Sequence, residues 1–163
     1  MNELTQKFYS AILNNDIEEC KNQIINVKLH EITSFFCMTF LHIAVYYKRL
    51  VICKLLIEHG APINVYSQSG RTPLMESAQN GEIDICKLLL EHGAIVNDTC
   101  NNNCTALYLA SIHGHIDICK LLLEYASDPT ICDRHGRSCV DVSKTEDIYL
   151  LLCGSGNKTK SCK

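Results

Sequence analysis

The sequence predicts an all-α repeat solenoid, in which pairs of short helices stack side by side. The segment "ICKLLLEHGA" at residues 85–94 has near copies, "ICKLLIEHGA" and "ICKLLLEYAS", at residues 52–61 and 118–127. Successive copies begin 33 residues apart, and the segments "TFLHIA", "TPLMES" and "TALYLA", which start at Thr39, Thr72 and Thr105, keep the same step. Self-similarity at one fixed period is the signature of a repeat architecture.

The first helix of each unit can be derived from the third copy, which is the cleanest. Thr72 and Pro73 open a helix, and proline is tolerated there because the first turn has no partner for its missing N–H. Leu74 and Ala78 share one face at a spacing of four residues, and the small side chain lets helices approach closely. Gly81 ends the helix, as glycine commonly does at a helix C-terminus.

The second helix follows at once. Asp84 lies near its start, where a carboxylate suits the helix dipole. Ile85, Leu88 and Leu89 give it an apolar stripe, and Gly93 stops it before an extended turn. One such unit leaves its apolar face exposed, so stacking on its neighbours is needed to bury that face.

The fixed step and the T-P-L-H-x-A type of opening carry a resemblance to a known family: the chain resembles the ankyrin-repeat proteins over residues 6–152, nearly its whole length. The resemblance implies a stack of about five helix-turn-helix repeats joined by hairpin-like turns. The expected organisation is a single domain, residues 1–152, followed by a flexible tail, residues 153–163. The expected repeats are residues 6–38, 39–71, 72–104, 105–137 and 138–152.

The two ends depart from the repeat pattern. Residues 8–24, "FYSAILNNDIEECKNQI", lack the T-P-L opening but read as two short helices joined at Asn14, Asn15 and Asp16. After Ser138 the sequence "CVDVSKTEDIYLLLC" brings the second helix early. We therefore expect a degenerate N-terminal cap and a truncated C-terminal cap, since terminal repeats have one neighbour only.

Composition bounds the function classes. The formal net charge of −3 gives no electrostatic argument for binding nucleic acid or an anionic membrane. The N-terminal residues do not have the pattern of a signal peptide, so the 11 cysteines are expected as reduced thiols in the cytoplasm or nucleus. Cys53, Cys86 and Cys119 follow the stripe isoleucines and are interpreted as small buried packing residues.

Motifs that would support catalysis are missing from the sequence. It contains no glycine-rich phosphate loop and no evident catalytic triad, so no enzyme activity and no cofactor are expected. His42 takes the histidine position of the T-P-L-H motif, where the resemblance implies a structural hydrogen bond to the turn. Met75 and Tyr108 replace it in the next two repeats, so His42 does not represent a shared catalytic group.

One alternative function uses cysteine and histidine. Cys100 and Cys104 precede His113 and His115, and these side chains are ligand types that suit zinc. The alternative is a metal-binding or redox-sensing protein built on these four residues. The family alignment argues against a metal site, because it assigns the cysteines to a turn tip and the histidines to the far end of the first helix.

The resemblance implies a protein-interaction module that binds through its concave face and turn tips, as a regulator or inhibitor. The chain is expected to be a monomer with protein partners. The expected contact positions are Phe35, Phe36, Met38, Tyr46 and Tyr47 in the second repeat; Gln68, Ser69, Arg71, Gln79 and Asn80 in the third; Asn101, Asn102, Cys104, Ile112 and His113 in the fourth; and Arg134, His135 and Arg137 in the fifth. This surface grades from aromatic through polar to basic, and an aromatic cluster is typical of binding hot spots. The two phenylalanines are open to a second interpretation, packing onto the first repeat.

Asn64 and Asn97 occupy equivalent places, each eight residues after a stripe leucine and directly after an apolar residue. Their position resembles that of the ankyrin asparagine modified by an oxygen-sensing asparaginyl hydroxylase, so both are candidate hydroxylation sites. The structural interpretation is that each amide bonds the backbone of its own turn and holds the hairpin between repeats. The two interpretations are compatible. Thr130 takes the equivalent place one repeat later.

Overall fold

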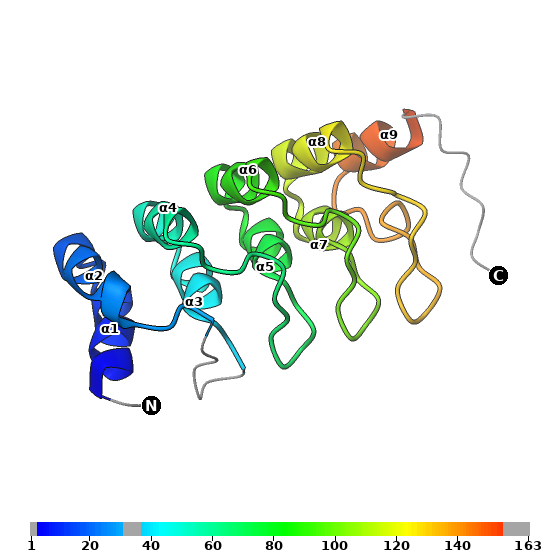
Figure 1. Cartoon of the computed structure of the whole chain (residues 1–163). Coiled ribbons are helices and arrows are strands. Elements are labelled where there is room, and N and C mark those ends of the chain that lie inside the picture. Colours follow the sequence, from blue (N-terminus) through cyan, green and yellow to red (C-terminus); the bar gives the residue numbers. More distant parts are fainter. Residues whose placement is uncertain (1–2, 31–36, 155–163) are drawn as a thin grey trace.

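The computed structural model describes residues 3–30 and 37–154, and the regular elements of these residues are helical (Figure 1). First and second helices alternate along the chain and form two rows. Hairpin loops project from the row of first helices. The first helices are α1 (Glu3–Asn14), α3 (Phe40–Tyr46), α5 (Pro73–Asn80) and α7 (Ala106–His113); the second are α2 (Ile17–Gln23), α4 (Leu50–Glu58), α6 (Ile83–Glu91) and α8 (Ile116–Glu124), followed by α9 (Glu146–Gly154).

The expected start and stop signals act as predicted in the central repeats. The hydroxyl oxygens of Thr39, Thr72 and Thr105 accept hydrogen bonds from backbone N–H groups in the first turns of α3, α5 and α7. Each threonine thus satisfies a donor that has no partner inside the helix. Gly81 and Gly114 then end α5 and α7 with φ of 78° and 86°, in the left-handed region that glycine enters at little cost.

The repeated cysteines belong to the core, as predicted. Cys53, Cys86 and Cys119 are each 0% exposed, between the first and second helices of their repeats. Cys86 also lies 3.1 Å from the Ser77 hydroxyl of α5. Burial raises the pKa of Cys53 and of Cys86 to about 12, so these thiols stay protonated at neutral pH and act as small apolar groups.

The N-terminal repeat is a real helix pair despite its missing motif. Its first helix, α1, begins at Glu3 and packs Phe8 edge-to-face on Phe40 of α3, with ring centroids 4.8 Å apart. Asn15 adopts a left-handed conformation with φ of 57°, and Asp16 caps α2 by accepting from the Glu19 N–H. The predicted junction at residues 14–16 is confirmed.

The C-terminal repeat has lost its first helix. Turns replace it between Cys139 and Val142, and only the second helix, α9, follows. The turns still close the stack, because the backbone N–H of Lys144 donates to the Ser111 carbonyl of α7 at 3.0 Å. The expectation of a truncated fifth repeat is therefore confirmed.

One cysteine departs from the expected reduced state. Cys132 is disulfide-bonded, so the expectation of a fully reduced chain is wrong there. It lies half-buried at the last hairpin, outside the helix-packed core that encloses Cys53 and its equivalents. The other described cysteines are free thiols. None of the helices in the described part of the chain has the length and apolar character needed to cross a membrane.

Candidate functional site

The exposed ends of the first helices form one candidate surface, which we call the concave face. Tyr46 and Tyr47, at the end of α3, are 54% and 40% exposed and meet edge-to-face at 5.2 Å. Ile112 takes the place of Tyr46 two repeats later and is 38% exposed. The remaining members of this face are Gln79, Asn80 and His113.

The hairpin tips are bonded to one another rather than free. The Asn101 N–H donates to the Ser69 carbonyl at 3.2 Å, and the Asn101 amide donates to the Gln68 carbonyl at 3.1 Å. One repeat later the Arg134 N–H donates to the Asn102 carbonyl at 3.0 Å. The tips therefore present a continuous, mutually fixed polar strip beside the concave face.

A charged lock closes the last tip. Asp133, 6% exposed, accepts the Tyr108 hydroxyl at 2.8 Å and the Arg137 guanidinium at 2.7 and 2.9 Å. Its other oxygen accepts the N–H groups of His135 and Arg137, both at 2.9 Å. Burial alone would raise the pKa of Asp133, but these hydrogen bonds outweigh it and lower that pKa. Arg137 is thereby oriented and partly neutralised, which leaves Arg134 as the more available cation.

His42 makes the structural bonds that the resemblance implied. Its Nδ1 lies 2.9 Å from the Thr39 hydroxyl, and its Nε2 lies 3.0 Å from the Arg71 carbonyl of the next tip. The ring is 0% exposed, and this burial lowers its pKa. His42 therefore joins two repeats as a neutral imidazole and does not reach the surface.

In the two preceding hairpin tips, other residues stand at the positions equivalent to Asp133 and Arg137. The Ser67 hydroxyl accepts the Arg71 N–H at 3.3 Å. In the next repeat, the Cys104 thiol donates to the Asn102 carbonyl at 3.6 Å. Burial, followed by the neighbouring Cys100, raises the pKa of Cys104 to about 11. Cys104 is 8% exposed, so the interpretation of this residue as a surface contact is wrong. It packs against Cys100 inside the tip.

A buried ion pair lies beneath the concave face. Glu76 of α5 is 5% exposed, and its carboxylate lies 3.5 Å from the Arg71 guanidinium. Arg71 is half-buried, so this predicted contact residue presents only part of its side chain. Because Arg71 also supplies the carbonyl that His42 binds, it connects the tip to two first helices.

Two lysines that the repeat alignment did not identify lie at the border of the concave face. Lys48 donates to the Asn80 carbonyl at 3.4 Å and pairs with Glu82 at 2.7 Å. Lys144 donates to the His113 carbonyl at 3.3 Å. Lys48 stands one repeat before Gly81 at the equivalent position, so the repeat alignment contained the information needed to identify it. Lys144 could not, because the fifth repeat breaks the 33-residue step.

The remaining predicted positions divide into three groups. Phe35 and Phe36 lie outside the described residues, so their expected role stays a prediction. Met38 is half-buried, and Gln79 and Asn80 are half-buried on α5. The exposed members of the predicted set, besides the residues already placed, are Gln68, Ser69, Asn101, Asn102, His113, Arg134, His135 and Arg137.

The metal-binding alternative does not fit this geometry. Cys100 and Cys104 lie in a tip, whereas His113 lies at the far end of α7, a helix of 8 residues that is about 12 Å long. His113 and His115 stack on each other, and His115 binds the Gln79 carbonyl at 3.0 Å. Within residues 3–30 and 37–154, no group of three or more His, Cys, Asp or Glu residues could hold a metal ion. The proposed four-residue metal site is therefore wrong.

Asn64 and Asn97 bond the following repeat and not their own turn. The Asn64 amide donates to the Gly93 carbonyl and accepts the Ile95 N–H, both at 3.0 Å. Asn97 repeats the pattern, accepting the Asp128 N–H at 2.8 Å. The own-turn interpretation is wrong because each side chain extends across the repeat boundary. Both side chains are nevertheless exposed.

Comparison with protein families identifies a family to which the chain is similar. A family model described as ankyrin repeats (3 copies) matches residues 8–100 and 41–133. The two matches together extend from α1 into the last hairpin tip, and they include the central repeats and end at Asp133. A search of curated proteins finds no match.

Proposed function

The chain belongs to the ankyrin-repeat family, and from this premise we propose that it binds a partner protein through the concave face and the hairpin tips. Ankyrin repeats are generally protein–protein interaction modules, and a fold of this kind supplies a scaffold on which exposed residues determine the partner. The proposal assigns contact roles to the exposed members of the predicted set and a supporting role to Arg71.

The observation that carries the proposal is the exposure of Tyr46 and Tyr47. Two neighbouring tyrosines in ring contact, 54% and 40% exposed, present a large amphipathic area at the end of α3. Tyrosine is enriched among interface hot spots because it buries a large area at a small entropic cost. Phe40 of the same helix is by contrast 0% exposed, whereas Tyr47 also contacts Tyr9 of α1, which packs against the core.

We further propose that the protein is a non-catalytic regulator or inhibitor that acts as a monomer by occupying its partner's surface. The free thiols of the described cysteines other than Cys132 support a reducing compartment, the cytoplasm or the nucleus. The partner is a protein and not a nucleic acid, in keeping with the net charge of −3.

The test is the double variant Tyr46→Ala/Tyr47→Ala in full-length protein, with a partner captured from the source cell and then purified. Binding should weaken by about 2 kcal/mol or more if the tyrosines are hot spots. Unfolding by denaturant should change little. Val51→Ala on α4 is the matched control, because Val51 is 51% exposed on a second helix. Lost stability with unchanged affinity per folded molecule would remove the tyrosines from the site.

Hydroxylation of Asn64 and Asn97 is proposed as a modification of the same module. Both side chains are exposed, which supports access, although each is hydrogen-bonded to the next repeat. Exposure to an asparaginyl hydroxylase followed by peptide mass analysis should show one added oxygen on the Asn97 peptide. Thr130 occupies the same register and provides an internal control. Two unmodified asparagine peptides would leave these residues with a structural role only.

A further inference from the structure

Four carboxylates near the concave face and the last hairpin tip are engaged within the protein. Glu82 pairs with Lys48 at 2.7 Å, and Glu76 lies beneath the face with Arg71. Asp141 accepts the Ser138 N–H and hydroxyl at 2.8 and 2.6 Å. Asp133 is held in its lock, so these four carboxylates are already paired or hydrogen-bonded, whereas exposed Glu146 lines the same surface hollow as Lys144.

Two cations on the same side have only neutral partners. Arg134 donates from Nε to the His135 ring at 3.1 Å, and Lys144 donates to the His113 carbonyl at 3.3 Å. Within the part of the chain that the structure describes, neither makes an ion pair. Their charges therefore remain available to an incoming group.

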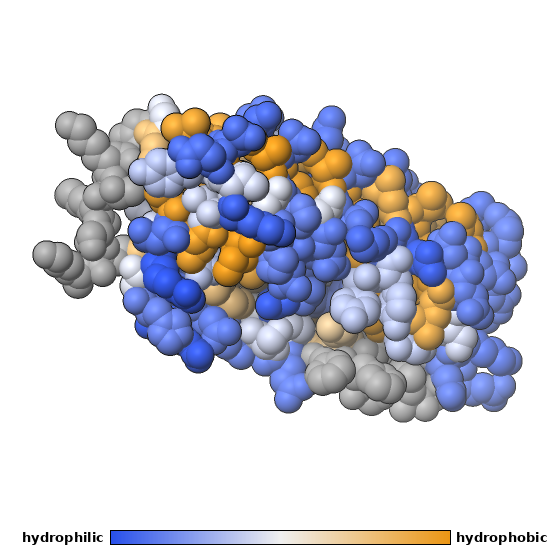
Figure 2. Space-filling model, turned by 180° about the vertical axis from the view of Figure 1, so that it is seen from behind, coloured by the Kyte–Doolittle hydropathy of each residue, from blue (hydrophilic) through white to orange (hydrophobic). Residues whose placement is uncertain are grey.

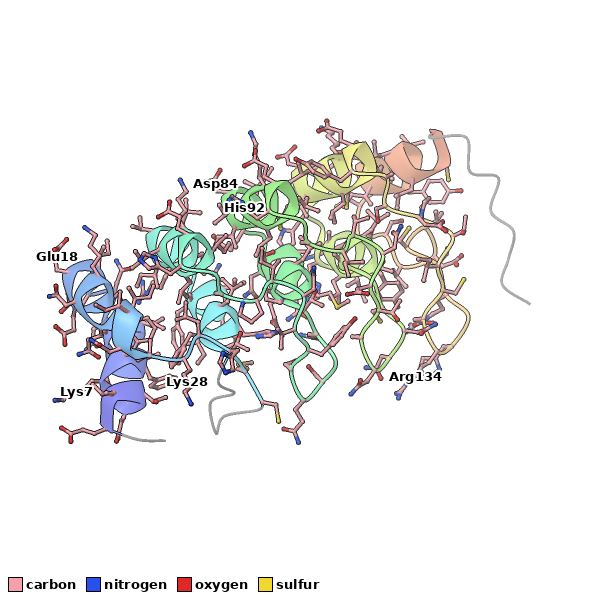
Figure 3. The ribbon with its side chains drawn as sticks, viewed as in Figure 1. Lys7, Glu18, Lys28, Asp84, His92 and Arg134 are labelled. Carbon is pink, nitrogen blue, oxygen red and sulfur yellow. The ribbon has the colours of Figure 1, made fainter. Side chains whose placement is uncertain are left out.

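The outer surface of the second helices has the opposite charge balance. Lys87 and Lys120 are paired with Glu91 and Asp117, at 4.0 and 3.6 Å. The exposed carboxylates Glu58, Asp84 and Glu124 exceed the one remaining exposed lysine of these helices, Lys54. Figure 3 shows Arg134 at the free end of the last hairpin and Asp84 on α6 at the opposite edge of the stack. The outer surfaces of α4, α6 and α8 thus carry more carboxylates than lysines.

An exposed apolar side chain lies beside Lys144. Lys144 is bonded to the carbonyl of His113, directly next to Ile112, which is 38% exposed. The tyrosine pair continues this face two repeats toward the N-terminus. Viewed from behind, hydrophobic areas alternate with hydrophilic residues along the stack (Figure 2).

From this arrangement we infer that the partner presents an acidic segment with an aromatic or aliphatic anchor. Its carboxylates lie against Arg134 and Lys144, and its anchor lies on Ile112 or on the tyrosine pair. Electrostatic complementarity of this kind favours correct partners and speeds encounter, while the anchor supplies most of the affinity. The inference rests on the proposed function and specifies the chemistry of the partner.

The test is a selection of random displayed peptides on the immobilised full chain. Enriched peptides should be richer in Asp and Glu than the starting library and should share an apolar residue. The affinity of a synthetic enriched peptide should fall about tenfold or more in Arg134→Glu/Lys144→Glu and should weaken with added salt. The matched charge reversal Lys87→Glu/Lys120→Glu, on the outer helices, should change it less than about twofold.

Other outcomes overturn the inference in distinguishable ways. Neutral or basic peptides that still lose affinity in Tyr46→Ala/Tyr47→Ala would overturn the acidic partner and leave the proposed face standing. Peptides insensitive to the tyrosine and charge-reversal variants alike would overturn both, as would a selection that enriches nothing over a blank surface. A labelled single-stranded oligonucleotide that binds and is lost in Arg134→Glu/Lys144→Glu would assign the cations to nucleic acid instead.

Discussion

His42 is enclosed where the second repeat meets the third. Its ring bonds to Thr39 and to the Arg71 carbonyl fix it as the neutral form, and burial lowers its pKa. In the unfolded chain the imidazole regains its ordinary pKa, so below about pH 6.5 the unfolded state binds more protons than the folded state. The stability associated with His42 is therefore complete above that pH and is lost as the pH falls below it.

This linkage gives a pH prediction. The free energy of unfolding should fall between pH 7.5 and pH 5.5, and the fall should be smaller in His42→Gln. His92→Gln is the control, because His92 is exposed at the end of α6 and makes only a local bond to the Leu88 carbonyl. Denaturant titrations at both pH values measure the slope. An unchanged slope in His42→Gln would mean that other groups set the acid sensitivity.

Asn97 shows how one side chain can hold two repeats together. It accepts the Asp128 N–H at 2.8 Å and donates to the Ala126 carbonyl at 3.4 Å. Asn97→Ala should destabilise the protein by about 1–2 kcal/mol, because it removes these bonds and the one accepted from the Ser127 hydroxyl at 3.5 Å, and leaves backbone groups to find water. Asn97→Asp keeps the acceptor and should cost less. A change within about 0.5 kcal/mol for Asn97→Ala, the usual surface range, would contradict the linking role.

The ends of α5 and α6 both use glycine with positive φ, but for different reasons. Gly81 has φ of +78°, and a Cβ there would lie 2.7 Å from Cε1 of His115. Gly93 has φ of +87° and open space around it. Both positions penalise an L-residue through the left-handed backbone, at about 1–2 kcal/mol. Only Gly81 also accommodates a side chain from the next repeat.

We therefore expect Gly81→Ala to destabilise the protein more than Gly93→Ala, by about 1 kcal/mol or more, since the substitution also displaces the His115 bond to Gln79. Urea unfolding of the two variants measures the difference directly. Equal losses in both variants would show that backbone conformation alone sets the cost and that His115 adjusts freely.

Element order was largely readable from the sequence because helix starts and stops depend on local chemistry. The threonine caps, Gly81 and the junction at Asp16 are contacts within one repeat, so a motif specifies them. Bonds between repeats were not readable in the same way. The spacing that located Asn64 gave its register but not its partner, which proved to be the turn of the next repeat.

The arrangement of the whole stack explains why some candidate site residues were predicted correctly and others were not. The repeat register correctly predicted that Tyr46, Tyr47 and Ile112 are exposed, since equivalent positions lie on one side of the solenoid. The same register wrongly predicted Cys104 to be exposed. Arg137, at the equivalent position one repeat later, extends outward and pairs with Asp133, whereas the shorter Cys104 side chain packs next to Cys100. The register also missed Lys144, which lies where the repeat pattern has ended.

The assignment of the binding surface is tested most directly by hydrogen–deuterium exchange of the full chain, alone and in complex with its purified partner. We predict slower exchange, on binding, in the C-terminal turns of α3, α5 and α7 and in the hairpin tips, with little change on the outer sides of α4, α6 and α8. Protection confined to those outer helices, with the tips and first helices unchanged, would contradict the account.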